Sequence, residues 1–342
     1  MHTILKRTTW LLPFIFFLLM NARPVFAIAS SDTVSDAKQI LNEVYQQVKN
    51  NQKGKNADYI PELGKVNPAL FGIAIATTDG KIMTIGDVDV PFAIESISKP
   101  FVYALALHDN GEQMVTEKVG LNATGRPFNS VMAIEEQPNH LQNALVNAGA
   151  IQITSMIHGQ DSNAKWEKVL DLMKKLSDGK PFLGMSVYQS EIATNQHNRA
   201  IAELLNSYGM MSSDPFDAVD RYTKACSVMV TTKELAWMGA TLANGGVNPL
   251  THQRVIPPAF VRDVLSEMVV NGLYENSGAW WWSVGLPAKS GVGGGIVAVV
   301  PGKMAIAVFS PPLDEAGNSV RAQEAIKELS RRWKLHLLEN KG

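Results

Sequence analysis

Stretches typical of β-strands stand at opposite ends of the sequence, and they constrain the fold more than any other feature. Residues 70–87 predict two strands around an Asp-Gly turn at residues 79–80. Residues 295–311 predict two buried strands around a turn at residues 301–303, and a charged amphipathic helix follows near residues 318–338. Because the segment between the two pairs has a different pattern, we expect both ends of the chain to share one antiparallel sheet.

The middle of the chain, roughly residues 96–270, has apolar spacings of three and four that are typical of helices. A sheet built from both ends with a mostly helical section packed beside it is an α+β architecture. We expect a cleft where the two parts meet. Before the sheet, residues 28–57 predict one helix near Ser35–Val48 and a loose polar linker, which leaves residues 58–342 as the main folded domain.

The composition is that of a globular protein with ample core. Of the 342 residues, 46% are hydrophobic and 18% are charged. The formal net charge is -1, so the chain lacks the basic footprint that nucleic-acid binding requires. The same balance argues against a charge-dense membrane or polyanion as a partner.

Residues 1–27 have the features of a secretory signal peptide. A basic pair at residues 6–7 precedes an apolar run at residues 10–20, and Val25 and Ala27 occupy positions −3 and −1 of a cleavage point. The apolar run is shorter than the ~20 residues that a membrane-spanning helix needs. An uncleaved anchor is the alternative.

Cys226 is the only cysteine, so the chain cannot form an intrachain disulfide. Together with the signal peptide, this predicts export to a bacterial periplasm. A free cysteine is usually a small buried hydrophobic residue, and no basic residue clearly pairs with Cys226 to make it a nucleophile.

Ser96 and Lys99 stand three residues apart, where an apolar strand-like run becomes helical. The N-terminus of a helix offers free backbone N–H groups and a positive dipole, which suit an attacking serine and a developing oxyanion. The dipole and burial both favour the neutral form of a nearby lysine, which can then take the proton of the serine. The alternative is an ordinary helix start, since serine caps helices and Pro100 suits a first turn.

A second candidate element, the triplet Lys-Ser-Gly at residues 289–291, precedes the C-terminal strand pair. Penicillin-recognising serine enzymes carry such a triplet on the sheet edge that faces their Ser-x-x-Lys motif. There the cation of Lys289 and an edge N–H can hold substrate and oxyanion. The alternative is a glycine-rich turn. Tyr274 is a candidate third element, although the Ser-Asp-Asn triplet of β-lactamases is absent from the sequence.

Histidines and tryptophans add no functional element. The sequence predicts no metal site, because its histidines form no His-Glu-x-x-His motif and no short cluster; they stand at positions 2, 108, 140, 158, 197, 252 and 336. The tryptophans at 280–282 predict packing within a strand, with a ligand platform as the alternative.

Several motifs together resemble those of the bacterial-type glutaminases, a serine-dependent family with a β-lactamase-like fold. In order and spacing they cover about residues 55–335. The motifs are DYIPEL at 58–63, GIAIATTDG at 72–80, ESISK at 95–99, GRPFNS at 125–130, VNAGAI at 146–151, Glu191 followed by NRA at 198–200, YTKACS at 222–227, GLYENSG at 272–278 and VGLPAKSGVGGGI at 284–296. The resemblance implies that same fold for this chain.

The resemblance also implies roles at the reacting centre. Ser96 is expected to be the nucleophile and Lys99 its proton acceptor. The backbone N–H groups of Ser96 and Val292 are expected to form the oxyanion hole. Tyr222 and Tyr274 are expected to line the centre and relay protons, and Lys289 to support it.

The residues implied to bind substrate are Tyr59, Asn147, Glu191 and Asn198, together with Ser96, Tyr222, Tyr274 and Val292. A carboxylate such as Glu191 can pair with the α-ammonium of an amino acid, and the amides of Asn147 and Asn198 can hold its α-carboxylate. Because Glu191 and Asn198 are seven residues apart, two turns of helix are expected to place them on one face.

The reaction implied by the resemblance is hydrolysis of L-glutamine to L-glutamate and ammonia through a γ-glutamyl ester on Ser96, with no cofactor. The resemblance also implies a homo-oligomer, either a dimer or a tetramer. Two alternatives stay open. One is a penicillin-recognising serine hydrolase or β-lactamase, and the other is a periplasmic amino-acid binding protein without catalysis.

Two positions depart from the family pattern. Asn143-Ala144 replaces an expected Asn-Pro step before Asn147, and the second departure lies beside the nucleophile. The residue before the nucleophile is usually glutamine in these glutaminases, and here it is Glu95. A carboxylate beside the nucleophile would raise the pKa of Lys99 and weaken it as a base. If Glu95 instead points away and pairs with another group, that effect is removed.

Overall fold

The computed structural model describes residues 31–339. The chain divides between Ala37 and Lys38 into two compact units, and the described part of the first unit is the beginning of helix α1. The signal-peptide prediction for residues 1–27 therefore lies outside the described residues. Within residues 31–339, every helix is too short or too polar to span a membrane.

The helices and strands follow in a fixed order along the chain. The helices are α1 (Ser31–Val48), α2 (Pro61–Gly64), α3 (Lys99–Asn110), α4 (Glu112–Lys118), α5 (Met132–Glu136), α6 (Asn147–Ser155), α7 (Ser162–Leu176), α8 (Met185–Thr194), α9 (Gln196–Ser207), α10 (Pro215–Cys226), α11 (Thr232–Ala243), α12 (Pro258–Asn271), α13 (Ser277–Val284) and α14 (Val320–Trp333), with the short 3₁₀ helices η1 (Glu95–Ser98) and η2 (Tyr274–Asn276). The strands are β1 (Gly72–Thr77), β2 (Ile82–Gly86), β3 (Phe92–Ala93), β4 (Phe182–Leu183), β5 (Val228–Val230), β6 (Ala288–Ser290), β7 (Gly295–Val300) and β8 (Met304–Phe309).

The main sheet joins the two ends of the chain, which confirms the prediction. Its five strands lie in the order β2-β1-β8-β7-β6, and each neighbouring pair is antiparallel. The N-terminal strand β1 pairs directly with the C-terminal strand β8, and Ile73 lies opposite Val308. The side chains of β1 and β7 are buried throughout, whereas those of β2 are partly exposed, so β2 is suited to an edge of the sheet.

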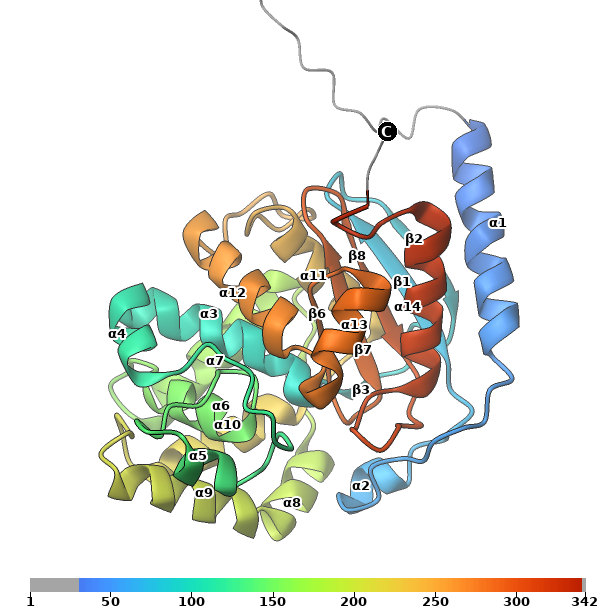
Figure 1. Ribbon diagram of the computed structural model, residues 1–342. Helices are drawn as coiled ribbons and strands as arrows, with labels where there is room; N and C mark the ends of the chain where they lie inside the picture. The colour runs from blue at the N-terminus through green and yellow to red at the C-terminus, as the bar shows by residue number, and fades with distance from the viewer. Residues whose placement is uncertain (1–30, 340–342) are drawn as a thin grey trace, which may run out of the picture. The chain divides into compact units, whose positions relative to one another are not determined.

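Helices cover both faces of this sheet (Figure 1). Larger side chains of β1 and β8 pack on one face against α14 and against Leu41, Val44 and Val48 of α1; they are Ile73, Ile75, Ile306 and Val308. The opposite face packs against α11 and is lined by small side chains, among them Ala74, Ala76, Ala305 and Ala307. Because these side chains are small, α11 approaches closely: a Cβ on its Gly239 would lie 2.6 Å from the Cβ of Ala305.

The predicted helical middle is also confirmed, since α3 to α12 occupy most of residues 99–271. A second sheet within this section, ordered β3-β5-β4, was not expected. Its strands have only two or three residues, which is too short for a pattern of alternation to stand out in the sequence. This small sheet nevertheless fixes the chain just before η1.

The prediction for the tryptophans at 280–282 is wrong. They lie in α13, where Trp280 is buried and its indole donates to the carbonyl of Leu286 at 2.8 Å, whereas Trp282 is 84% exposed. Gly285 then takes a left-handed conformation that ends the helix, so a strand begins only at Ala288. An apolar run this short fits a helix or a strand equally well until its neighbours are placed.

The last helix is shorter than predicted. It ends at Trp333 instead of near residue 338, because Lys334 adopts a left-handed conformation with φ 51° and stops the helix.

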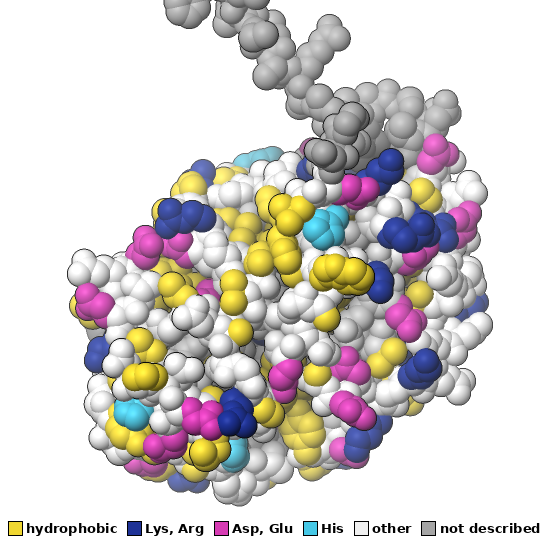
Figure 2. Space-filling view, in the orientation of Figure 1, with side chains coloured by type: hydrophobic (Ala, Val, Ile, Leu, Met, Phe, Trp, Pro, Cys, Tyr) yellow, Lys and Arg dark blue, Asp and Glu magenta, His cyan; other side chains and the backbone are white. Residues whose placement is uncertain are grey.

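The surface shows a mixed distribution of charge: on the face drawn in Figure 2, basic and acidic side chains are interspersed.

Glu267 makes stability depend on pH. It lies on α12, which packs against α3, is only 4% exposed, and accepts a hydrogen bond from Asn271 Nδ2 at 2.7 Å. Burial raises the pKa of Glu267 to about 7, although the bond from Asn271 opposes this shift. The folded chain therefore keeps a proton that the unfolded chain loses near pH 4.5, and the stability that this proton supplies falls as pH rises from about 4.5 to about 7.

We expect Glu267→Gln to raise the free energy of unfolding at pH 8 by about 2 kcal/mol, since it removes the cost of a buried charge. At pH 4.5 the two proteins should be nearly equally stable. Urea unfolding between pH 4.5 and 8 measures this difference, with the exposed Glu203→Gln as a matched control. A difference that does not change with pH would contradict the prediction.

Candidate active site

Ser96 lies on a sharp turn between the small sheet and helix α3. It belongs to η1, which leads directly into α3, and Pro100 occupies the first turn of that helix. Glu95 has φ 51°, a left-handed conformation that is uncommon for a residue with a side chain and that often marks functional sites. The Ser96 side chain is 5% exposed, so the turn presents its hydroxyl in a nearly dry environment.

Lys99 is buried one turn after Ser96, but its amine is held by another residue. Its Nζ donates to Asn147 Oδ1 at 2.7 Å and to the Leu145 carbonyl at 3.4 Å, and no hydrogen bond to Ser96 accompanies these in residues 31–339. Burial lowers the pKa of Lys99 to about 8, although interactions with Cys226 and Glu95 oppose this. A neutral, proton-accepting amine is thus accessible near neutral pH.

Asn147, at the start of α6, connects the lysine with two other predicted residues. Its Oδ1 accepts from Lys99 and also from the Tyr222 hydroxyl at 3.1 Å. Its Nδ2 donates to Asn198 Oδ1 at 3.0 Å. The structure therefore brings four residues, from α3, α6, α9 and α10, into one hydrogen-bonded network.

Tyr274 reaches the same centre from η2, with φ 54°. Its phenol donates to the Ser290 carbonyl at 3.4 Å; burial raises the pKa of this phenol, and its interaction with the Ser96 side chain opposes that shift. Lys289 lies 4.1 Å from the centre of the Tyr274 ring, is fully buried, and donates to the carbonyls of Gly272 and Ser290 at 3.0 and 2.6 Å. The supporting position predicted for Lys289 is thus beside the tyrosine ring, where burial holds the pKa of Lys289 well below its usual value.

A glycine-rich turn brings Val292 next to η1. A Cβ on Gly293 would lie 2.2 Å from the carbonyl oxygen of Ala93, so only glycine permits this approach. In the part of the chain that the structure describes, the N–H groups of Ser96 and Val292 donate to no protein acceptor. Both are therefore available to an oxyanion.

Glu95 and Glu191 form a buried carboxyl pair. Glu95 is 3% exposed and Glu191 8% exposed, and Ser227 Oγ donates to Glu191 Oε1 at 3.0 Å. Burial raises the pKa of Glu95 well above its usual value, and the charge of Glu191 and a hydrogen bond to Glu191 add to this shift. Burial raises the pKa of Glu191 to about 7, against the bonds from Ser227 and Glu95. The pair therefore shares one proton near neutral pH, because burial and mutual repulsion disfavour two adjacent carboxylates.

This pairing answers the question raised by Glu95. A carboxyl pair that shares one proton carries one negative charge instead of two, which limits how far it stabilises the ammonium form of Lys99. A protonated carboxyl, like a glutamine amide, is able to donate a hydrogen bond to Glu191. The departure from the family pattern therefore places a second titratable carboxyl group beside Glu191.

Tyr59 and Asn198 complete the predicted substrate residues. Tyr59 as a whole is 58% exposed, whereas burial of its phenol raises the pKa of that group, and the charges of Glu95 and Glu191 add to the shift. The prediction that one helix carries Glu191 and Asn198 is wrong. Glu191 lies in α8 and Asn198 in α9, because the chain leaves helical geometry at Asn195.

Sequence reasoning missed two neighbours of this site. Ser227 binds Glu191, and the buried Cys226 lies beside the carboxyl pair and Tyr222. Both residues fall in the YTKACS motif at the end of α10, but a single cysteine and a serine carry no spacing that would have assigned them a contact. Only the approach of α8 to α10 brings them to Glu191.

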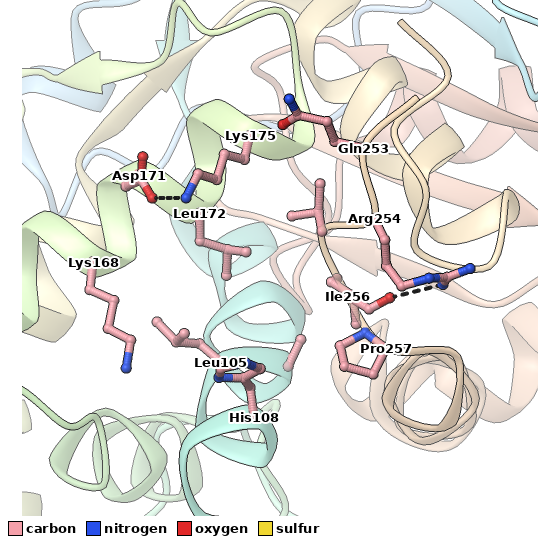
Figure 3. Close-up of a pocket in the computed structure, with 12 residues that line it drawn as sticks. Leu105, His108, Lys168, Asp171, Leu172, Lys175, Gln253, Arg254, Ile256 and Pro257 are labelled. Atoms are coloured by element: carbon pink, nitrogen blue, oxygen red, sulfur yellow. Dashed lines mark hydrogen bonds and ion pairs between the residues drawn. The ribbon is translucent and has the colours of Figure 1, made fainter. Parts of the chain in front are cut away.

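A separate pocket with a volume of about 280 Å³ lies between α3, α7 and residues 253–257 (Figure 3). Leu105, Leu172 and Ile256 line it, and none of the predicted site residues does. Its basic side chains are already occupied: Lys175 pairs with Asp171, and Arg254 donates to backbone carbonyls. The chemistry therefore gathers around Ser96 and not in this pocket.

Comparison with known sequences gives one consistent result. The family model described as glutaminase matches residues 54–338. A glutaminase of Colwellia psychrerythraea is 52% identical over 299 residues, which are 87% of this chain and 96% of the relative. Glutaminase 1 of Escherichia coli strain K12 is 50% identical over 294 residues, covering 86% of this chain and 95% of the relative.

Solved structures agree with the sequences. The structure of a probable glutaminase, YbaS, superimposes with a TM-score of 0.88 at 48% identity and covers 90% of this chain and 99% of its own. A probable glutaminase from Bacillus subtilis, complexed with 6-diazo-5-oxo-L-norleucine, superimposes with a TM-score of 0.78 at 31% identity, covering 88% of this chain and 94% of its own.

Proposed function

The chain belongs to the glutaminase family, and from that membership we propose that it hydrolyses L-glutamine through a covalent γ-glutamyl ester on Ser96. Its fold is the β-lactamase-like fold of the related glutaminases. The observation that carries the mechanism is the convergence of Ser96, a buried Lys99 of lowered pKa and two free N–H groups, one from η1 and one from the glycine-rich turn at Val292.

The reaction has two halves. In the first, Ser96 Oγ attacks the side-chain carboxamide carbon, its proton passes through the tyrosine phenols to the neutral Lys99, and the N–H groups of Ser96 and Val292 hold the oxyanion. The C–N bond then breaks, and ammonia leaves with a proton returned by the same relay. In the second half, water gives a proton to the relay and attacks the ester, which releases L-glutamate and restores Ser96.

The α-amino acid end of the substrate is held by the polar residues around this centre. The Glu191 carboxylate pairs with the α-ammonium, and the amides of Asn147 and Asn198 hold the α-carboxylate. Tyr59 completes this set of substrate-binding residues. These buried polar groups disfavour ligands that would leave them unpaired, which gives discrimination that apolar contacts alone do not provide.

Release of ammonia by the purified protein tests this function. We expect release from L-glutamine and none from L-glutamate. A chromogenic β-lactam supplies the contrast, because rapid β-lactam hydrolysis without ammonia from glutamine would instead support a penicillin-recognising hydrolase. Calorimetric binding of glutamine with no ammonia release would support an amino-acid binding protein.

The activity should rise with pH through the pKa of Lys99. The base acts only when neutral and its pKa is about 8, so kcat/KM for glutamine is expected to rise about tenfold between about pH 7 and about pH 9. Steady-state ammonia release across this range measures the rise. In Lys99→Met the remaining activity should not rise with pH. A wild-type kcat/KM that stays constant between about pH 7 and about pH 9 would exclude Lys99 as the base.

We also propose that residues 1–27 are removed as a signal peptide and that the mature chain works in a bacterial periplasm. The basic pair, the apolar run and the small residues before Ile28 support this. Mass spectrometry of the protein from the periplasmic fraction should give a chain that begins at Ile28. An intact chain in the membrane fraction would instead support an uncleaved anchor.

We further propose a homo-oligomer, a dimer or a tetramer, on the basis of family membership. Exposed apolar side chains such as Trp282 and Leu338 are consistent with a covered surface. Sedimentation equilibrium should give a multiple of the chain mass, and a monomer at all concentrations would contradict this.

A further inference from the structure

Three potential metal ligands meet in the interior beside the proposed reacting centre. Glu95 of η1, Glu191 of α8 and Cys226 at the end of α10 are all buried, and one ligand atom from each lies within 4.8 Å of the other two. Positions 95, 191 and 226 are too far apart in sequence to form a recognisable ligand motif. The constellation exists only in the folded chain.

An unpaired atom indicates that this cluster lacks a partner. Glu95 Oε1 is buried and has no hydrogen-bond partner among the described residues. Such an atom costs free energy in a folded protein unless a ligand or ion satisfies it. The orphaned oxygen belongs to one of the three potential ligands, so a cation bound there would satisfy it.

The donor set selects the kind of cation. Binding of a cation would release the proton of the carboxyl pair and the proton of the Cys226 thiol to solvent. The two carboxylates and one thiolate that result match Zn²⁺ and the larger Cd²⁺, whereas Mg²⁺ and Ca²⁺ prefer six or more oxygens. Around Zn²⁺ the ligand atoms would be about 3.5 Å apart, so the side chains must close by about 1 Å, and the longer bonds of Cd²⁺ need less movement. Two lysines interact electrostatically with this cluster: Lys99 with Glu95 and Cys226, and Lys289 with Cys226. The phenols of Tyr59 and Tyr222 interact with the two carboxyl groups.

We propose that Glu95, Glu191 and Cys226 form a binding site for a thiophilic divalent cation such as Zn²⁺. The bound cation prevents the α-ammonium of the substrate from pairing with Glu191. The blocking part rests on the proposed function, in which Glu191 pairs with that ammonium. A carboxylate that coordinates a divalent cation is not available to an ammonium, and the two positive charges repel each other. The cation therefore inhibits in competition with glutamine.

Titration of the metal-free full chain with Cd²⁺ tests the site directly. The bond between Cys226 and Cd²⁺ gives a thiolate-to-metal charge-transfer absorption, and we expect it to saturate at one Cd²⁺ per chain. Adding L-glutamate should weaken the binding of Cd²⁺, and Zn²⁺ should inhibit ammonia release in competition with glutamine. Mg²⁺ should neither bind at this site nor inhibit ammonia release.

Two variants assign the ligands. Glu95→Gln keeps the shape of the side chain but removes one carboxylate, so the Kd for Cd²⁺ should rise at least about tenfold. Cys226→Ala should remove the absorption altogether. The matched control is Glu117→Gln on the exposed surface of α4, which should leave the Kd unchanged.

Absence of the absorption in the wild-type chain would overturn the proposal, and so would a Kd that Glu95→Gln leaves unchanged. Neither measurement needs turnover. A chain that binds Cd²⁺ in this way but releases no ammonia would therefore refute only the proposed function. A chain that hydrolyses glutamine without the absorption would refute only the metal site.

Discussion

Replacing Ser96 with alanine is expected to abolish glutamine hydrolysis while glutamine still binds. The substitution removes the atom that forms the ester, and loss of a catalytic nucleophile reduces kcat by at least about 10⁴-fold. The residues proposed to hold the α-amino and α-carboxylate groups keep their own partners, since Glu191 bonds Ser227 and Asn147 bonds Asn198. Ammonia release measures the loss, and calorimetry with glutamine measures the retained binding.

Ser98 provides a matched control in the same turn. It is also buried, and although it stands at the N-cap position of α3 its side chain makes no capping bond, so Ser98→Ala should keep nearly wild-type activity. A γ-glutamyl adduct trapped during turnover should appear by mass spectrometry in the wild-type protein and not in Ser96→Ala. Near-wild-type turnover by Ser96→Ala would exclude Ser96 as the nucleophile.

The architecture was predictable because the signals that decide it are long. Each strand pair at the chain ends has an apolar run and a turn of glycine with a polar residue, and neither pair is stable without a larger sheet. Pairing β1 with β8 joins both strand pairs into one larger sheet. The errors occur where the signal is short: the two-residue strands β3 and β4, and the apolar run at 280–282, whose helical form depends on the stop at Gly285.

The residues of the site were predictable as a set through family spacing, but their mutual contacts were not. The sequence spacing placed Lys99 near Ser96, whereas in the structure the amine of Lys99 donates to Asn147. The left-handed conformations of Glu95 and Tyr274 have no signal in the sequence, because neither residue is glycine. The pairing of Glu95 with Glu191 depends on how α8 lies against η1 and α10, which is a tertiary property.

Gly293→Ala should reduce kcat strongly although it replaces no side chain of the active site. A Cβ at this position would lie 2.2 Å from the backbone oxygen of Ala93 and 3.3 Å from Cγ of Glu95. Backbone cannot give way as a flexible side chain can, so the turn at residues 291–294 must move away from η1. The N–H of Val292 moves with it, and loss of one oxyanion donor costs about 10²- to 10³-fold in kcat.

The comparison with Gly278→Ala isolates this geometric effect. Gly278 lies in α13, and a Cβ there would meet no atom within 4 Å, so that variant should keep wild-type kcat. Gly293→Ala should still bind L-glutamate, because Glu191, Asn147 and Asn198 are held by elements other than the displaced turn. Lost binding together with lost cooperative unfolding would indicate a folding defect, whereas retained binding with low kcat supports an oxyanion site set by the approach of residue 293 to β3. An unchanged kcat would mean that the Val292 N–H does not act on the oxyanion.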